Sequence, residues 1–280
     1  MSKISIVVDT TCDLSPELME SRDIIFIPLT VNIDGDIYRD KIDISSREFY
    51  EKISGKGIFP KTSLISPAEF ESIFKNELDK GNEVVCITVS SKLSGTYNSA
   101  NIAKDTLSSD RIHIIDGKTA SSGSALLILE ASRLAKEGNS IHTIINHIDN
   151  LIEKQKCMIY MDTMEMLKRG GRIPKSLATI GGMLKIKPIL TVKDGELEPV
   201  AKVRGKKAAY NEIVDSIAKE EIDKRYPLMI AHANNLEYAT EMITMLKDYI
   251  SDMEVIISEI GPVVGTHSGE GTIAVWITKR

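Results

Sequence analysis

The stretch "EVVCITVSSKLSGTYNSA" at residues 83–100 decides the fold class, because it leads from a buried strand through a hydroxyl-rich loop into a helix. Residues 83–90 are apolar and β-branched, which is typical of a strand covered on both faces of a sheet. Comparable runs lie at 3–9 and 111–116, with helix-like segments between them. Strands that alternate with helices predict a mostly parallel sheet with helices on both faces.

Helix start signals support this alternation. Ser15 precedes Pro16, and Ser66 precedes Pro67 with Glu69 three residues after the serine, which are patterns typical of helix N-termini. Residues 24–33 predict one further strand, and the Asp-Gly pair at 34–35 predicts a hairpin turn after it.

The second half of the chain follows a different pattern. Residues 187–205 predict a hairpin around Asp194-Gly195, and helices are expected at about 206–224 and 235–250 between isolated strands. This order predicts a mixed or antiparallel sheet with helices on one face. We therefore expect an N-terminal α/β domain at 1–155 and a C-terminal α/β domain at 156–280.

The composition of the chain indicates which classes of protein it can belong to. The chain has 280 residues, 42% hydrophobic residues and a net charge of −5, which is ordinary for a globular protein and argues against non-specific nucleic-acid binding. Its three cysteines, Cys12, Cys86 and Cys157, are far apart and odd in number, as expected in a reducing compartment. No signal peptide or membrane span is evident, so we expect a cytoplasmic location.

Three loops combine glycine or proline with hydroxyl groups, at 60–67, 90–100 and 117–125. Each precedes a predicted helix, where hydroxyls and free backbone N–H groups can bind an anion. In any one loop, capping of the helix is an adequate explanation; three such loops favour a ligand. No P-loop and no G-x-G-x-x-G run is present, so a carboxylate fits better than a nucleotide phosphate.

His267 lies in "IGPVVGTHSGEGTIAVWI" at 260–277, with no cysteine or second histidine at metal-ligand spacing. We expect a glycine-lined turn between two apolar core strands, with the imidazole as a further donor to the carboxylate. The alternatives are a packed core histidine, or a hydrolase in which Ser94 and His267 act together. No G-x-S-x-G motif supports the hydrolase.

Two basic clusters occur in the second half of the chain. One contains Arg169 and Arg172 in "LKRGGRIPK", and the other contains Arg204 in "KVRGKK". Each alone is most simply a solvated surface, but together they could dock an acidic partner.

Several of these stretches together resemble the DegV family, which includes the fatty-acid-binding subunits of bacterial fatty acid kinase. They are "VDTTCDL", "TSLISPAEF", "SSKLSGTYNSA", "LKRGGRI", "KPIL", "VRGKKA" and "IGPVVGTHSGEGTIAV". They occur in this order, and the resemblance covers nearly the whole chain, residues 3–278. The resemblance implies a single unit of two α/β domains with a long-chain fatty acid buried between them. It implies that Thr62, Ser94 and His267 hold the carboxylate, and we add their neighbours to the expected site: Ser63, Gly95, Thr96 and Thr266.

The resemblance also implies a carrier without catalysis of its own and without a metal or other cofactor. A separate kinase would phosphorylate the bound acid to an acyl phosphate for phospholipid synthesis, and Arg169, Arg172 and Arg204 are the candidates for docking it. A hydrolase of acyl esters and a lipid-binding regulatory protein without a kinase partner are the alternatives. We expect neither nucleic-acid binding nor stable membrane insertion.

Overall fold

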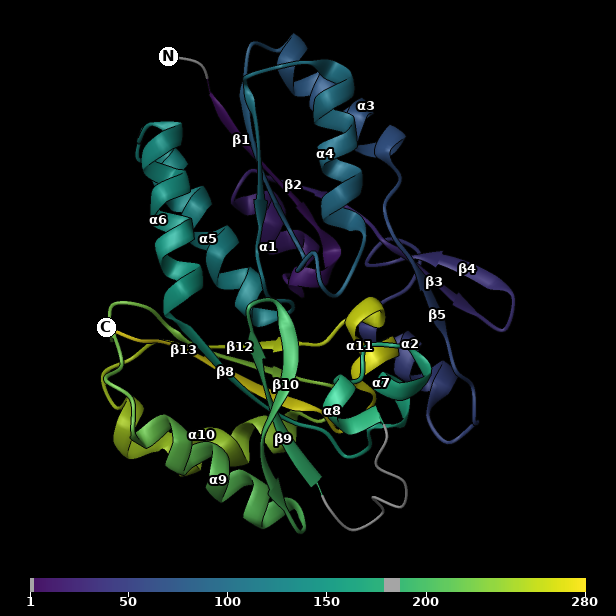
Figure 1. The fold of residues 1–280 in the computed structure, drawn as a ribbon, viewed down its shortest axis with the longest axis vertical. Coiled ribbons are helices and arrows are strands. Elements are labelled where there is room, and N and C mark those ends of the chain that lie inside the picture. The colour runs from purple at the N-terminus through teal and green to yellow at the C-terminus, as the bar shows by residue number, and fades with distance from the viewer. Residues whose placement is uncertain (1–2, 179–186) are drawn as a thin grey trace.

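The computed structural model describes residues 3–178 and 187–280, which form two large sheets and a third, smaller one (Figure 1). The first large sheet is entirely parallel and has the strand order β2-β1-β6-β7. Its strands are β1 (Ile4–Asp9), β2 (Ile24–Ile27), β6 (Glu83–Thr88) and β7 (Ile112–Asp116). The predicted parallel sheet is confirmed.

Helices cover both faces of this sheet (Figure 1). Helices α3 (Pro67–Asp79) and α4 (Thr96–Leu107) pack together on one side, and α5 (Ser122–Lys136) and α6 (Ile141–Lys154) on the other. The short helices α1 (Pro16–Ser21) and α2 (Ser46–Ile53) complete this half. The predicted caps are confirmed, because Ser15 accepts from Leu18 N and Ser66 forms a capping box with Glu69.

The expectation of one strand over residues 24–33 is wrong. The run divides at Pro28 into β2 and β3 (Thr30–Ile33), which belong to different sheets. Proline has no N–H group to donate to a sheet ladder, so the strand cannot continue through it. Strand β3 pairs antiparallel with β4 (Asp36–Arg39) across the predicted Asp-Gly turn, and with β5 (Lys61–Ser63) on its other side.

The second large sheet is mixed, with the order β10-β9-β8-β13-β11-β12. Among the strands that the structure describes in this sheet, only β11 and β12 pair in parallel, and the other pairs are antiparallel. The strands are β8 (Gln155–Tyr160), β9 (Lys187–Lys193), β10 (Glu196–Val203), β11 (Leu228–His232), β12 (Val255–Glu259) and β13 (Ile273–Thr278). Asp194 and Gly195 both have positive φ at the β9–β10 turn, as expected for this hairpin.

Helices α9 (Lys206–Ala218) and α10 (Leu236–Ile250) cover the outer face of this sheet (Figure 1). Helix α9 ends earlier than the expected residue 224. Beyond it the backbone pairs with the last strand, because Asp223 N donates to Thr278 O and Ile222 forms a bridge with Lys279. The short helices α7 (Glu165–Arg169), α8 (Lys175–Ala178) and α11 (Pro262–Ser268) lie together at the other side of the sheet (Figure 1).

Side chains alternate between two cores along β8 and β13. Cys157, Ile159, Ala274 and Trp276 face the core shared with the first sheet. The residues between them on each strand face α9 and α10 instead: Met158, Tyr160, Val275 and Ile277. Both faces of the sheet are therefore buried at β8 and β13, which is why the sequences of these strands are continuously apolar. Among the described residues, no helix is both long and apolar enough to cross a membrane.

Candidate functional site

His267 lies on α11 and not in the expected turn. The expectation that "IGPVV" forms a core strand is also wrong, because β12 ends at Glu259 and Pro262 starts the helix at its first position. Proline suits this position, since its fixed φ matches a helix and its missing N–H is not needed there. Gly269, with φ of 77°, follows the helix and turns the chain towards β13.

Two glycines allow α11 to pack closely against its neighbours. A Cβ at Gly265 would lie 2.6 Å from Tyr50 Oη and 3.0 Å from Phe49 Cε1, so the helix can rest on α2 only with glycine there. A Cβ at Gly170, just after α7, would collide with Nδ1 of His267. The imidazole is therefore held between α7 and β5.

Thr62 is the hydrogen-bond partner of His267. Its Oγ1 lies 2.9 Å from His267 Nε2, although 205 positions separate the two residues. Strand β5 places Thr62 opposite Val31 in the small sheet, so the side chain reaches α11 from the N-terminal half. The predicted proximity of these two residues is present in the structure.

The environment of His267 favours a neutral imidazole. Burial, and then the positive charge of Arg172, lower its pKa to about 4. Nδ1 is buried and has no hydrogen-bond partner among the described residues. In the neutral ring, one nitrogen is bonded to Thr62 and the other has no partner. The imidazole can therefore still accept a hydrogen bond from a ligand or donate one to it.

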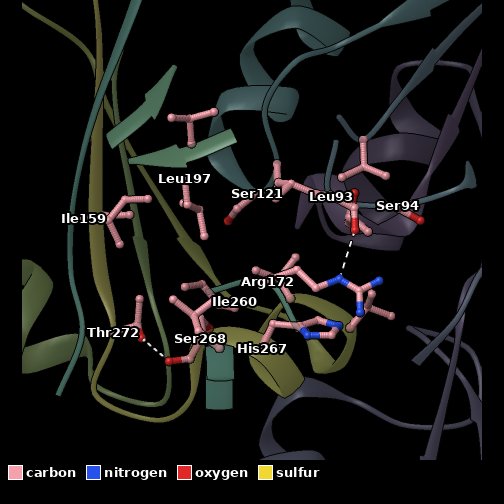
Figure 2. Close-up of a pocket in the computed structure, with 18 of the residues that line it drawn as sticks. Leu93, Ser94, Ser121, Ile159, Arg172, Leu197, Ile260, His267, Ser268 and Thr272 are labelled. Atoms are coloured by element: carbon pink, nitrogen blue, oxygen red, sulfur yellow. Dashed lines mark hydrogen bonds between the residues drawn. The ribbon is translucent and has the colours of Figure 1, made fainter. Parts of the chain in front are cut away.

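Arg172 lies beside His267 with its guanidinium at the pocket (Figure 2). Nε donates to Leu93 O at 3.1 Å, and Nη1 donates to Gly170 O at 2.6 Å. No carboxylate pairs with it within residues 3–178 and 187–280. This partly buried positive charge is therefore available to an anionic ligand.

Ser94 approaches from the loop that precedes α4. Its Oγ lies 2.9 Å from Thr96 Oγ1 and accepts weakly from Thr96 N at 3.3 Å. Within the described chain it makes no hydrogen bond to His267, whose Nε2 is taken by Thr62. The pair required for a Ser/His hydrolase is therefore not formed in this structure.

A pocket lies between the two large sheets and is lined at one side by these four residues. Figure 2 shows Ser94, Arg172 and His267 together, with Ile159 and Leu197 opposite them. It contains about 820 Å³ of space that protein atoms do not fill, part of it open to solvent. Most of the remaining lining is apolar: Leu29, Val89, Leu93, Ala120, Ile159, Met161, Leu167, Val192, Leu197, Ile260, Val263, Val264, Ala274 and Trp276.

A cavity that is apolar except for clustered polar groups at one side is typical of a site for an amphipathic small molecule. The model of the DegV family of uncharacterised proteins matches residues 3–280. The chain belongs to the DegV family. A DegV domain-containing protein of Clostridium acetobutylicum is 38% identical, with both chains covered completely.

Solved structures of similar proteins have the same fold. A protein from Thermus thermophilus, described as a fatty-acid-binding DegV family member, has a TM-score of 0.89 at 30% identity, with 99% of this chain and 100% of that chain covered. A stearic-acid-binding protein from Eubacterium ventriosum has a TM-score of 0.84 at 28% identity, covering 100% of this chain and 98% of that one.

The four neighbouring residues in the expected DegV site lie outside the pocket lining. Ser63 is exposed on β5, and Gly95 lines an adjoining surface groove. Thr96 is buried and bonded to Ser94, while Thr266 Oγ1 donates to Pro262 O within α11. These residues belong to the segments that carry Thr62, Ser94 and His267.

The three arginines expected to dock a partner have different environments. Arg172 lines the pocket, whereas Arg169 is exposed, pairs with Glu165 at 2.6 Å and stacks its guanidinium 3.6 Å from the centre of the Phe59 ring. Arg204 is exposed at the end of the β9–β10 hairpin, just before α9. Only Arg169 and Arg204 therefore have the exposure that a docking contact requires.

Sequence reasoning missed several pocket residues. Ser121 lies in the hydroxyl-rich loop at 117–125, so the sequence showed its hydroxyl group but not the direction of its side chain. Thr11 lies outside the three loops noted for their hydroxyl groups. Ser268 and Trp276 carried no such signal, because their apolar or glycine-rich surroundings resemble ordinary core. Among the residues described, no cluster of three or more potential metal ligands occurs.

Proposed function

We propose that this DegV protein binds a long-chain fatty acid in the pocket between its two large sheets. The observation that carries the proposal is the grouping of Thr62, His267 and Arg172 at one side of a mostly apolar cavity. The fatty-acid-binding relatives with the same fold support it.

The polar groups suit a carboxylate. Arg172 supplies positive charge without a competing acid among the described residues, and Thr62, Ser94 and neutral His267 supply hydrogen-bonding groups. A buried carboxylate is stable only when such partners satisfy it, so the head group would be oriented as well as held.

The apolar walls suit the tail. About fifteen methylene and methyl groups, at about 0.8 kcal/mol each, give a gross gain on the order of 12 kcal/mol before the entropic costs of binding. The tail therefore supplies affinity, while the head group needs only to offset its own desolvation and fix the orientation.

We further propose that the protein is a carrier without catalysis of its own. It would present the carboxylate to a separate fatty acid kinase, which forms an acyl phosphate for phospholipid synthesis. The chain lacks a Ser94–His267 hydrogen bond among its described residues, which favours a carrier over an acyl-ester hydrolase. The exposed Arg169 and Arg204 are the proposed contacts with the kinase.

In this proposal residues 1–155 and 156–280 act as two domains that enclose the ligand from opposite sides. The protein would work in the cytoplasm, where the buried, unpaired thiols of Cys12, Cys86 and Cys157 remain reduced.

Mass spectrometry of lipid extracted from natively purified protein tests the central proposal. We expect a long-chain fatty acid in near-stoichiometric amount, and uptake of the same acid by delipidated protein. Absence of lipid together with no uptake would overturn the proposal. Hydrolysis of activated acyl esters that Ser94→Ala abolishes would favour the hydrolase instead.

A further inference from the structure

The acyl pocket shares a wall with a second cleft. Val192 and Trp276 line both cavities, and most of the other residues that line the second are polar or charged. They include Lys118, Lys156, Lys193 and Lys279. An apolar cavity thus meets a polar cleft across two side chains, one from β9 and one from β13.

Strand β13 gives the direction of the pocket. Thr272 precedes the strand, and it lines the cavity together with Ala274 and Trp276, because alternate residues share one face. At about 3.4 Å per residue, Trp276 lies roughly 14 Å along the strand from Thr272. Thr272 follows α11 closely and donates to Ser268 O, next to His267 (Figure 2). Trp276 therefore lies at the end of this run that is remote from His267 and the expected head group.

The indole is fixed in place. Its Nε1 donates to Thr119 Oγ1 at 3.4 Å, and the side chain is only 3% exposed. On one side the ring lies so close to Gly123 that a Cβ there would approach Nε1 to 2.5 Å. Trp276 cannot move towards α5, so it is a rigid part of the wall.

We propose that Trp276, with Val192, forms the end wall of the acyl pocket and sets the longest tail that the protein accepts. This proposal rests on the proposed fatty-acid binding. In the native protein a tail ends against the indole, because continuing would require displacing it. Removal of the wall would connect the pocket to the cleft, where the aliphatic stems of the lysines could cover additional methylenes.

Two variants open the wall in different ways. Trp276→Leu removes most of the ring, and Val192→Ala removes two methyl groups from a partly exposed residue. The matched control is Ile277→Ala, which shortens a buried side chain on the same strand but on the face towards α9 and α10. Val192→Ala carries the test if the tryptophan variant does not fold.

Delipidated proteins are loaded from an equimolar mixture of saturated fatty acids that differ in steps of two methylenes, and the bound acids are identified by mass spectrometry. One buried methylene corresponds to about 0.8 kcal/mol, or roughly fourfold in affinity. We expect the ratio of the next longer acid to the wild-type optimum to rise severalfold, up to about fifteenfold, in the opened variants. The Ile277→Ala distribution should match wild type.

Unchanged distributions in both opened variants would overturn the assignment of the wall, as would an equal shift in Ile277→Ala. Failure of wild-type protein to bind any acid in the mixture would instead refute the proposed fatty-acid binding itself.

Discussion

Thr62 Oγ1 lies 2.9 Å from His267 Nε2, and this contact joins an edge strand of the small sheet to the helix that precedes the last strand. The two residues come from opposite halves of the chain and meet at the pocket. Thr62→Val keeps the shape of the side chain and removes its hydroxyl. We expect bound fatty acid to be retained, with affinity lower by about 1–3 kcal/mol, because a buried donor or acceptor loses its partner.

In Thr62→Val and in His267→Ala, acyl phosphate production with a cognate kinase should fall by a larger factor than the affinity for fatty acid. The reason is that both substitutions change the position of the head group. Ser63→Ala is the control, because Ser63 is the exposed neighbour on β5. Output equal to wild type in His267→Ala would contradict a positioning role for the imidazole.

Gly170→Ala should displace the imidazole without altering it chemically. The new Cβ would collide with His267 Nδ1, so the ring must rotate away from Thr62. We expect acyl phosphate output close to that of His267→Ala, with overall stability reduced by about 1–3 kcal/mol from overpacking.

The neighbouring glycine provides a control for Gly170→Ala. Gly171 has φ of 71°, a conformation that asparagine tolerates, and a Cβ there meets no atom within 4 Å. Gly171→Asn should therefore behave as wild type. If Gly170→Ala and Gly171→Asn lose acyl phosphate production equally, the cause is a change in the loop after α7 and not the contact with His267.

The lowered pKa of His267 predicts a stability loss in acid. Burial, followed by Arg172, lowers this pKa from 6.5 to about 4. Between these values the unfolded chain binds a proton that the folded chain does not, so the free energy of unfolding falls as pH decreases from 6.5 to 4. The loss is on the order of 3 kcal/mol. Urea unfolding of ligand-free protein across this range should show a shallower pH dependence for His267→Gln than for wild type.

Asp40 should have the opposite pH dependence. It is fully buried, and burial raises its pKa to about 7 against the lowering effects of Lys41 and of the nearby Thr10 hydroxyl. The folded state therefore holds the proton more tightly, and the contribution of Asp40 to stability falls as pH rises from about 4 to 7.

Removing the charge of Asp40 should relieve this penalty. We expect Asp40→Asn to unfold at a higher temperature than wild type at pH 8, with a smaller gain at pH 5. Asp43→Asn is the control, because Asp43 is paired with Arg39 and its pKa is lowered to about 2. Equal stability of Asp40→Asn and wild type at pH 8 would contradict a buried charge at this position.

Substitutions of Arg172 and Arg204 should affect different functions, the first ligand binding and the second partner docking. Arg172→Gln removes the charge beside the pocket and should lower the amount of fatty acid retained. Arg204→Gln changes an exposed residue outside the pocket, so fatty acid should be retained while kinase-dependent acyl phosphate falls. Measuring both quantities in each variant distinguishes the roles, and loss of fatty acid in Arg204→Gln would contradict the division.

Local patterns predicted the elements whose stability comes from nearby residues. Ser15 and Ser66 cap helices as expected, and Asp194-Gly195 forms the hairpin turn, because such signals act within a few residues. The prediction failed at Pro28 and at Gly261-Pro262, where an apolar run was read as one strand although proline ended one element or started another. A run of apolar residues indicates burial but does not by itself distinguish a buried strand from a buried helix.

By itself the sequence determined the alternation of strands and helices, the hydroxyl-rich loops and the presence of Thr62, Ser94, Arg172 and His267. Only the tertiary structure decided that Arg172 lies in the pocket, that His267 bonds to Thr62 and not to Ser94, and that Trp276 lines both the pocket and the second cleft. The reason is physical: backbone pattern and capping are local, whereas the direction of a side chain into a shared cavity depends on how α11, α7 and β13 pack against the first sheet. That packing is set by contacts between residues more than a hundred positions apart, such as the contact of Tyr50 with Ile260.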